Sequence, residues 1–134
     1  MMKRYKTPVV PVSWGELIDK ITILEIKNSK IESIDSINNI QKELKELSNI
    51  AKINKLPEKI IFLKRDLTDI NLKLWAVEDE IREKDFKSQF DEEFIELAKS
   101  VYRLNDVRAQ IKKSINLTLQ SELIEEKSYK KFNS

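Results

Sequence analysis

The chain contains no cysteine and no histidine, and it contains a single glycine. Without cysteine it forms no disulfide and offers no thiolate to a metal or a substrate, and without histidine it lacks the commonest general base and metal ligand. The single glycine, Gly15, is expected in the first turn of a helix, which is not the strand-to-helix setting of a phosphate-binding loop. These absences exclude most familiar catalytic constellations, and we expect neither a metal nor a cofactor.

Charge of one sign is also not in excess. The chain has 25 Lys and Arg against 23 Asp and Glu, for a formal net charge of +2. Such a balanced chain creates no strong field toward nucleic acid, and we predict no nucleic-acid partner. The apolar run near the N-terminus is short and is broken by Pro8 and Pro11, so it is neither a signal peptide nor a membrane span. We therefore expect a cytoplasmic protein that binds no membrane.

The remaining composition is typical of a helix-dominated protein, with one glycine and three prolines beside 36% charged and 40% hydrophobic residues. The most regular stretch runs from residue 57 to residue 84. Its apolar residues recur at alternating steps of three and four, which predicts one face of a long helix packed in the manner of a coiled coil. They are Ile60, Leu63, Leu67, Ile70, Leu74, Val77 and Ile81.

Similar spacing elsewhere predicts an all-α fold, an antiparallel bundle that forms a single domain over residues 1–134. We expect an extended N-terminal arm over 1–12 and a C-terminal tail over 121–134 that forms a short helix or an arm. The four main helices are predicted at about 13–33, 36–54, 57–85 and 91–120.

Helix start signals support these boundaries. Ser13 is the expected N-cap of the first helix, and Glu16, three residues later, completes the pattern of a capping box. Asp35 or Ser36 is the expected cap of the second helix and Asp91 that of the fourth.

Arg108 interrupts the apolar face of the fourth helix at a position where the spacing requires an apolar residue. An unpaired guanidinium is costly to bury, so Arg108 needs a carboxylate partner or a site filled by water or a ligand. Glu25 is the candidate partner that we select. The polar residues nearest the wide apolar face of the first helix are Asp19, Lys20, Thr22, Glu25 and Asn28.

A polar pocket inside the bundle is the resulting hypothesis. If the third and fourth helices form a hairpin around residue 88, residues whose numbers sum to about 176 lie at one level, which brings Asn71 near Asn105. The pocket would be cationic enough to hold a small anionic ligand. Alternatively, Arg108 makes one ion pair that fixes the helix register, and its polar neighbours are solvated. The candidate pocket residues are Glu25, Asn71, Trp75, Glu78, Asn105, Arg108 and Lys112.

Four blocks spread over most of the chain carry a family resemblance: VSWGELIDKITILEIK (12–27), LWAVEDEIR (74–82), VYRLNDVRAQIKKSIN (101–116) and SELIEEKSY (121–129). Together they resemble an uncharacterised bacterial protein family that is described only as a domain of unknown function. The resemblance implies that the four blocks belong to one domain. It implies no activity, cofactor or substrate.

Two classes of function remain. Long helices with two-sided apolar faces favour a non-enzymatic helical interaction or scaffold module, and apolar surface left uncovered by the shorter first pair of helices favours a homo-oligomer or another protein partner. The alternative is a small-anion-binding or catalytic site inside the bundle, by fold-level analogy with the all-helical chorismate mutases. We prefer the first interpretation, and the sequence leaves open whether the protein is an enzyme.

Overall fold

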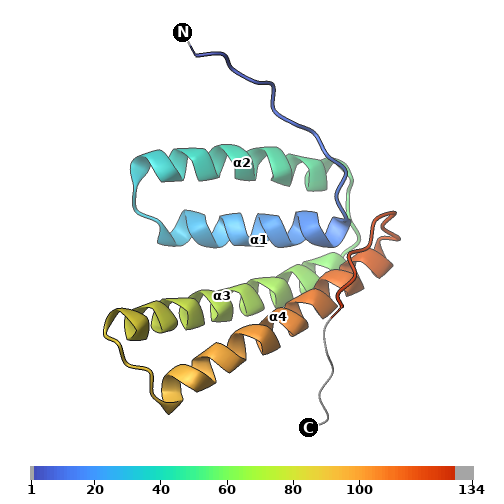
Figure 1. Cartoon of the computed structure of the whole chain (residues 1–134). Coiled ribbons are helices and arrows are strands. Elements are labelled where there is room, and N and C mark those ends of the chain that lie inside the picture. The colour runs from blue at the N-terminus through green and yellow to red at the C-terminus, as the bar shows by residue number, and fades with distance from the viewer. Residues whose placement is uncertain (1, 129–134) are drawn as a thin grey trace.

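The computed structural model describes residues 2–128, which form four α-helices joined by short turns (Figure 1). No strand occurs within that range. The predicted all-α fold is therefore confirmed. The helices are α1 (Trp14–Lys30), α2 (Ile34–Ile53), α3 (Lys59–Phe86) and α4 (Glu92–Thr118).

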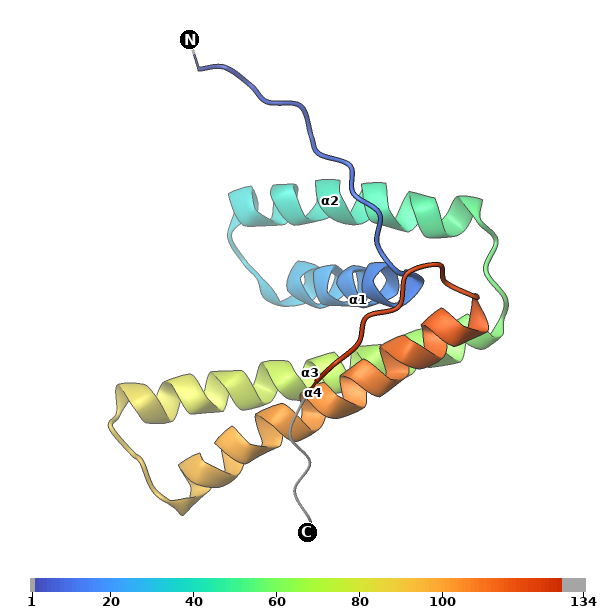
Figure 2. The same cartoon turned by 45° about the vertical axis from the view of Figure 1, so that its right-hand side comes forward.

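The central helix is α1, because it packs against α2, α3 and α4, whereas α2 packs against α1 alone. Figures 1 and 2 show the pair of α1 and α2 stacked on the pair of α3 and α4. Each pair is an antiparallel hairpin, as the short connections require. The molecule is thus a bundle of two stacked hairpins in which α1 is contacted on three sides.

The apolar core lies where α1 meets α3 and the C-terminal part of α4. Leu67 of α3 and Ile115 of α4 are fully buried against Leu17, Ile18 and Ile21 of α1. All seven apolar residues predicted to form the packed face of α3 are buried or half-buried, which confirms that face. Burying a side chain of this size is worth about 1.5–3 kcal/mol, so this cluster anchors α1 on the long hairpin.

The two predicted caps on α1 and α4 are confirmed. Ser13 Oγ accepts a hydrogen bond of 3.0 Å from the backbone N–H of Glu16, and the Asp91 carboxylate accepts one of 2.9 Å from the backbone N–H of Phe94. A capping box also has the carboxylate of the third residue accept a hydrogen bond from the backbone N–H of the cap. The Glu16 carboxylate binds Lys112 of α4 instead.

The connection between α1 and α2 differs from the prediction. We expected the first helix to continue to residue 33 and the second to be capped by Asp35 or Ser36, but α1 ends at Lys30 and Ser33 is the N-cap of α2. Ile31 already has extended backbone angles, so the chain leaves the helix earlier. Ser33 also caps α2 without a side-chain hydrogen bond, so its residue type carries little signal.

The two ends of the described chain are non-helical. Residues 2–12 form an extended arm whose side chains are all exposed. The chain after α4 turns back and reaches the start of α1, so the part of the tail within 121–128 is an arm and not a helix; the rest of the predicted tail, 129–134, lies outside the described residues. None of the helices within 2–128 combines the length and the apolar character that a membrane crossing requires.

Candidate functional site

A buried ion pair joins α1 to α4. The Asp19 side chain is 1% exposed, and it faces Arg108 across the interface between the two helices. Arg108 Nε donates a hydrogen bond of 3.0 Å to Asp19 Oδ1, and the second guanidinium nitrogen, Nη2, donates a close hydrogen bond to Asp19 Oδ2. Two parallel bonds of this kind fix both the distance and the plane of the guanidinium.

Two further side chains complete the polar cluster around this ion pair. Asn71 of α3 donates from Nδ2 to Asp19 Oδ1 and to Thr22 Oγ1, each at 2.9 Å. Thr22 in turn donates to the backbone carbonyl of Asp19 at 2.7 Å. Within residues 2–128 no buried side-chain nitrogen or oxygen lacks a partner. The cluster therefore ties α1, α3 and α4 together with its hydrogen bonds satisfied, as a polar core requires.

The ion pair also holds Arg108 in its charged form. Hydrogen bonding to Asp19 raises the pKa of Arg108 above its ordinary value, and this effect outweighs the lowering caused by burial. The negative charges of Asp19, Glu16 and Glu78 act in the same direction. The guanidinium is thus a permanent cation at the inner wall of the site.

A hollow of about 200 Å³ opens beside the cluster between α1, α3 and α4. Its wall is partly apolar and partly charged. Lys27 of α1 and Glu78 of α3 bring opposite charges to it. Neither side chain makes a hydrogen bond or an ion pair within the described chain, although the charge of Glu78 acts on Arg108. The lining residues are Ile23, Ile26, Lys27, Asn71, Leu74, Trp75, Glu78, Asn105 and Arg108.

Five of the seven candidate residues selected from the sequence line this one hollow. The predicted level pairing of Asn71 with Asn105 agrees with this, since both residues contribute to the same wall. That these residues form a binding site stays a prediction, because their convergence shows only where they lie. The five are Asn71, Trp75, Glu78, Asn105 and Arg108.

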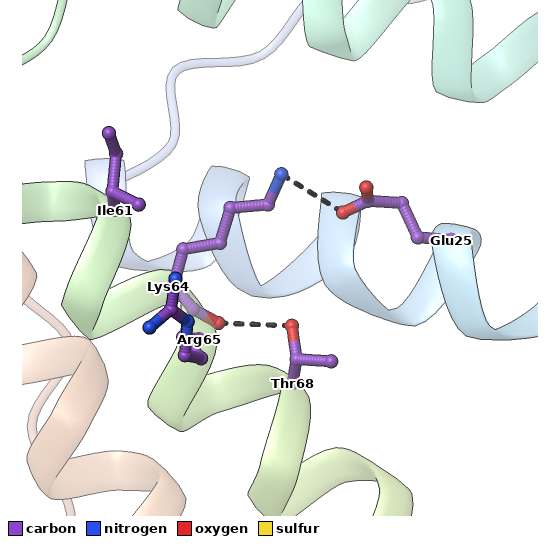
Figure 3. Close-up of a pocket in the computed structure, with 5 residues that line it drawn as sticks. All are labelled: Glu25, Ile61, Lys64, Arg65 and Thr68. Carbon is purple, nitrogen blue, oxygen red and sulfur yellow. Dashed lines mark hydrogen bonds and ion pairs between the residues drawn. The ribbon is translucent and has the colours of Figure 1, made fainter.

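Glu25 is not the partner of Arg108, and this part of the prediction was wrong. It forms an ion pair of 3.1 Å with Lys64 of α3 and lines a second hollow of about 250 Å³ (Figure 3). Asp19 and Glu25 are six positions apart, so they lie about 9 Å apart along α1 and on different faces of it. Asp19 occupies the face toward α4, and Glu25 the face toward the start of α3.

Lys112 also lies away from the hollow. Its ammonium binds the Glu16 carboxylate at 2.6 Å and is 3.7 Å from Glu125. This contact is one turn of α4 beyond Arg108, at the junction between the N-terminus of α1 and the returning C-terminal arm. Lys112 therefore holds the junction together and does not contribute to the pocket.

The same junction contains a network of helix-capping contacts that the sequence did not predict. Asn116 Oδ1 accepts a hydrogen bond of 2.6 Å from the backbone N–H of Gly15, and Ser121 Oγ accepts one of 3.2 Å from that of Trp14. Glu125 accepts bonds from Ser13 and Asn116. The free N–H groups in the first turn of α1 are thus satisfied by residues more than 100 positions away.

Asp19 is the central site residue that sequence reasoning did not select. It was one of several polar residues near the apolar face of the first helix, and Glu25 was chosen in its place. A usable signal was present, since Asp19 stands seven residues before Ile26 and three before Thr22, and both of those side chains are buried. This spacing puts Asp19 on the same packed stripe of α1.

The fold and its cluster define a small all-α protein in which two stacked helical hairpins are joined by a buried Asp–Arg pair. The chain belongs to DUF6165, a family of unknown function, whose model matches residues 8–134. This match includes the apolar end of the N-terminal arm together with all four helices. No curated protein and no solved structure matches the chain.

Proposed function

We propose that the protein is a non-catalytic helical interaction module that self-associates, with the N-terminal arm of one copy seated on a second copy. The observation that carries the proposal is an exposed arm with apolar side chains beside an apolar groove in the same chain. A chain that carries both surfaces is complementary to a copy of itself, which favours a symmetric dimer.

The groove runs along α1 beside the start of α3, and α2 lines it at one end only. At one end it is an apolar hollow of about 190 Å³, and at the other it is the hollow shown in Figure 3. Ile61 and Lys64 line both hollows, so the two are adjacent. This opening follows from the fold. Because α2 packs on α1 alone, it leaves the flank of α1 that faces α3 uncovered. The lining of the apolar end is Ile18, Ile21, Ser48, Ala51, Leu56, Pro57, Ile60, Ile61 and Lys64.

The arm supplies the apolar side chains that such a groove would bury. Val9 is 94% exposed and Val10 is 68% exposed, although both are strongly apolar. Pro8 and Pro11 fix the backbone angles around them, so docking orders few new torsions and costs less conformational entropy. The arm therefore has the properties of a preorganised, extended ligand.

A second copy is the favoured occupant because of the direction of the arm. In Figures 1 and 2 the arm leaves the start of α1, passes α2 and ends beyond it, on the side away from α3 and α4. The start of α1, the end of α2 and the start of α3 lie at the same end of the molecule, so the arm of each copy begins close to the groove of its own chain. A two-fold pair would then exchange arms over a short distance.

Sedimentation velocity over a range of protein concentrations tests the proposal. We expect a monomer–dimer equilibrium for the unaltered chain and a monomer for Val9→Asp/Val10→Asp and for Ile61→Asp. All three substituted residues are exposed, so the helical circular dichroism should not change. Phe86→Asp is the control, because Phe86 is 89% exposed and lies at the opposite end of α3.

A strict monomer at every concentration would contradict the proposal, and so would a dimer that survives the double substitution in the arm. A dimer abolished by Phe86→Asp would place the interface at the other end of the hairpin.

Catalysis of the chorismate-mutase kind is less well supported by the geometry. That chemistry needs several cations to bind a dicarboxylate, whereas Asp19 already binds two of the three guanidinium nitrogens of Arg108 and Glu16 binds Lys112. The cytoplasmic location stays a prediction from the sequence.

A further inference from the structure

We propose that the hollow between α1, α3 and α4 binds a small zwitterion, a molecule the size of an amino acid that carries one carboxylate and one ammonium group. Arg108 and Lys27 would receive the carboxylate, and Glu78 would receive the ammonium. This site is separate from the groove and the arm, so it stands or falls independently of self-association.

The carboxylate half of the site rests on the fixed orientation of Arg108. Its Nε and Nη2 are bound by Asp19, and Nη1 makes only a long contact of 3.5 Å with Asn105 Oδ1. A guanidinium has five N–H donors, so Nη1 retains a donor for a ligand in the hollow. Asp19 holds the donor in place before a ligand arrives, which reduces the entropy cost of binding.

The ammonium half rests on charge balance. Asp19 is the hydrogen-bonded partner of Arg108, and the two remaining charged groups at the hollow, Lys27 and Glu78, have opposite signs. Within residues 2–128 neither makes a hydrogen bond or an ion pair, and Glu78 acts on Arg108 through its charge alone. A simple anion would leave Glu78 facing a second negative charge. A zwitterion gives each group a partner of opposite charge, and complementarity of this kind sets the specificity of a site.

The size and the apolar wall define the rest of the ligand. Pockets for drug-sized molecules enclose roughly 300–1,000 Å³. At about 200 Å³ this hollow suits something smaller. The Trp75 ring, with Ile23 and Leu74, provides a surface for one apolar side chain, and a partly buried Trp is well suited to this. An aliphatic or aromatic amino acid has the required combination of groups.

An NMR titration of the Trp75 indole N–H tests the proposal, with Trp75→Phe used to assign that signal against Trp14. Glycine, L-leucine and L-phenylalanine are the zwitterionic probes. N-acetyl-L-leucine lacks the ammonium group and L-leucinamide lacks the carboxylate. We expect saturable shifts with L-leucine or L-phenylalanine, and affinities weaker by about tenfold or more for both blocked derivatives, because each loses a charged hydrogen bond.

Two variants and one control identify the groups involved. Glu78→Gln should remove the preference for L-leucine over N-acetyl-L-leucine. Lys27→Gln should weaken the preference for L-leucine over L-leucinamide without removing it, because Arg108 still binds the carboxylate. Glu25→Gln is the matched control, because Glu25 is also an exposed carboxylate but lines the other hollow. It should leave every affinity unchanged.

Three outcomes would overturn the proposal. One is the absence of a saturable shift with all three amino acids at millimolar concentration, and another is binding of N-acetyl-L-leucine as tight as that of L-leucine. The third is an equal loss of affinity in Glu25→Gln and Glu78→Gln, which would show that the amino acid does not bind specifically in this hollow.

Discussion

Asp19 and Arg108 share one ion pair but differ in their access to water. The Asp19 side chain is 1% exposed, whereas the Arg108 side chain is 28% exposed. If Arg108 is removed, the carboxylate remains buried without its cation. If Asp19 is neutralised, the long Arg108 side chain still has a route to solvent. The two halves of the pair should therefore contribute unequally when each is removed alone.

We predict that Arg108→Met lowers the free energy of unfolding by about 3–5 kcal/mol, the cost of an uncompensated buried charge. Asp19→Asn should lower it by about 1–3 kcal/mol, because the amide retains part of the hydrogen bonding. The double variant should lose less than the sum, since neither charge is then left alone. Urea denaturation measures all three values.

Arg103→Met is the control, because Arg103 is an exposed arginine of α4, and it should change the free energy of unfolding by less than about 0.5 kcal/mol. Equal costs for the two single variants would contradict this asymmetry.

The helices were predictable because apolar periodicity records packing directly. The face of α3 was readable from its spacing alone, and the caps Ser13 and Asp91 are local signals that the structure confirms. The other helix ends carry weaker signals. Lys55, Ser88 and Gln120 adopt positive φ angles near the ends of α2, α3 and α4, a backbone conformation that usually favours glycine. With a single glycine in the chain, none of these positions is marked by residue type.

The site was predictable in part, for a related reason. Arg108 stood out because it breaks an apolar pattern, and the hairpin register brought Asn71 and Asn105 to one level. The partner of Arg108 depends on how α1 is rotated against α4, which one helix's spacing does not specify. The contacts of Glu125 with Ser13 depend on the path of the returning arm, and no local pattern encodes them.

Gly15 lies so close to α4 that a methyl group has no room. An added Cβ would be 2.5 Å from the Lys112 carbonyl oxygen and 3.0 Å from Asn116 Oδ1. Alanine favours helix by about 1 kcal/mol over glycine, so propensity alone predicts that Gly15→Ala is stabilising. We expect the opposite sign, a loss of about 1–3 kcal/mol, because the carbonyl belongs to a packed backbone and α1 must move away from α4. Thermal denaturation decides between the two signs, and a raised melting temperature would show that the contact between α1 and α4 yields easily.

Glu125 should make the junction at the start of α1 sensitive to acid. Burial by itself raises the pKa of Glu125, but hydrogen bonds from Ser13, its own backbone and Asn116, together with the charge of Lys112, outweigh it and lower the pKa below 4.5. A lowered pKa in the folded state means that the unfolded state binds more protons as the pH falls through this range. The stability that Glu125 contributes is thus complete above about pH 4.5 and is lost as the pH falls through its folded pKa.

The measurement compares the unaltered chain with Glu125→Gln, which does not titrate. We expect their difference in free energy of unfolding to be constant near neutral pH and to shrink toward zero below the folded pKa of Glu125. A difference that persists unchanged in acid would mean that the carboxylate charge does not contribute to the junction.

Ser13 and Asp91 both cap a helix with a side-chain hydrogen bond, but they should contribute unequally to the free energy of unfolding. Ser13 is 3% exposed and also donates a 2.6 Å hydrogen bond to Glu125, so Ser13→Ala removes a cap and leaves a carboxylate without one of its donors. Asp91→Ala removes a cap and a surface ion pair with Lys84, and exposed pairs contribute little. We predict a loss of about 2 kcal/mol for Ser13→Ala and a smaller loss for Asp91→Ala in urea denaturation. Combining Ser13→Ala with Glu125→Gln should cost less than the sum of the single changes, because both act on one hydrogen bond. Strict additivity, or equal costs for the two caps, would mean that the contact between Ser13 and Glu125 adds nothing to the local cap.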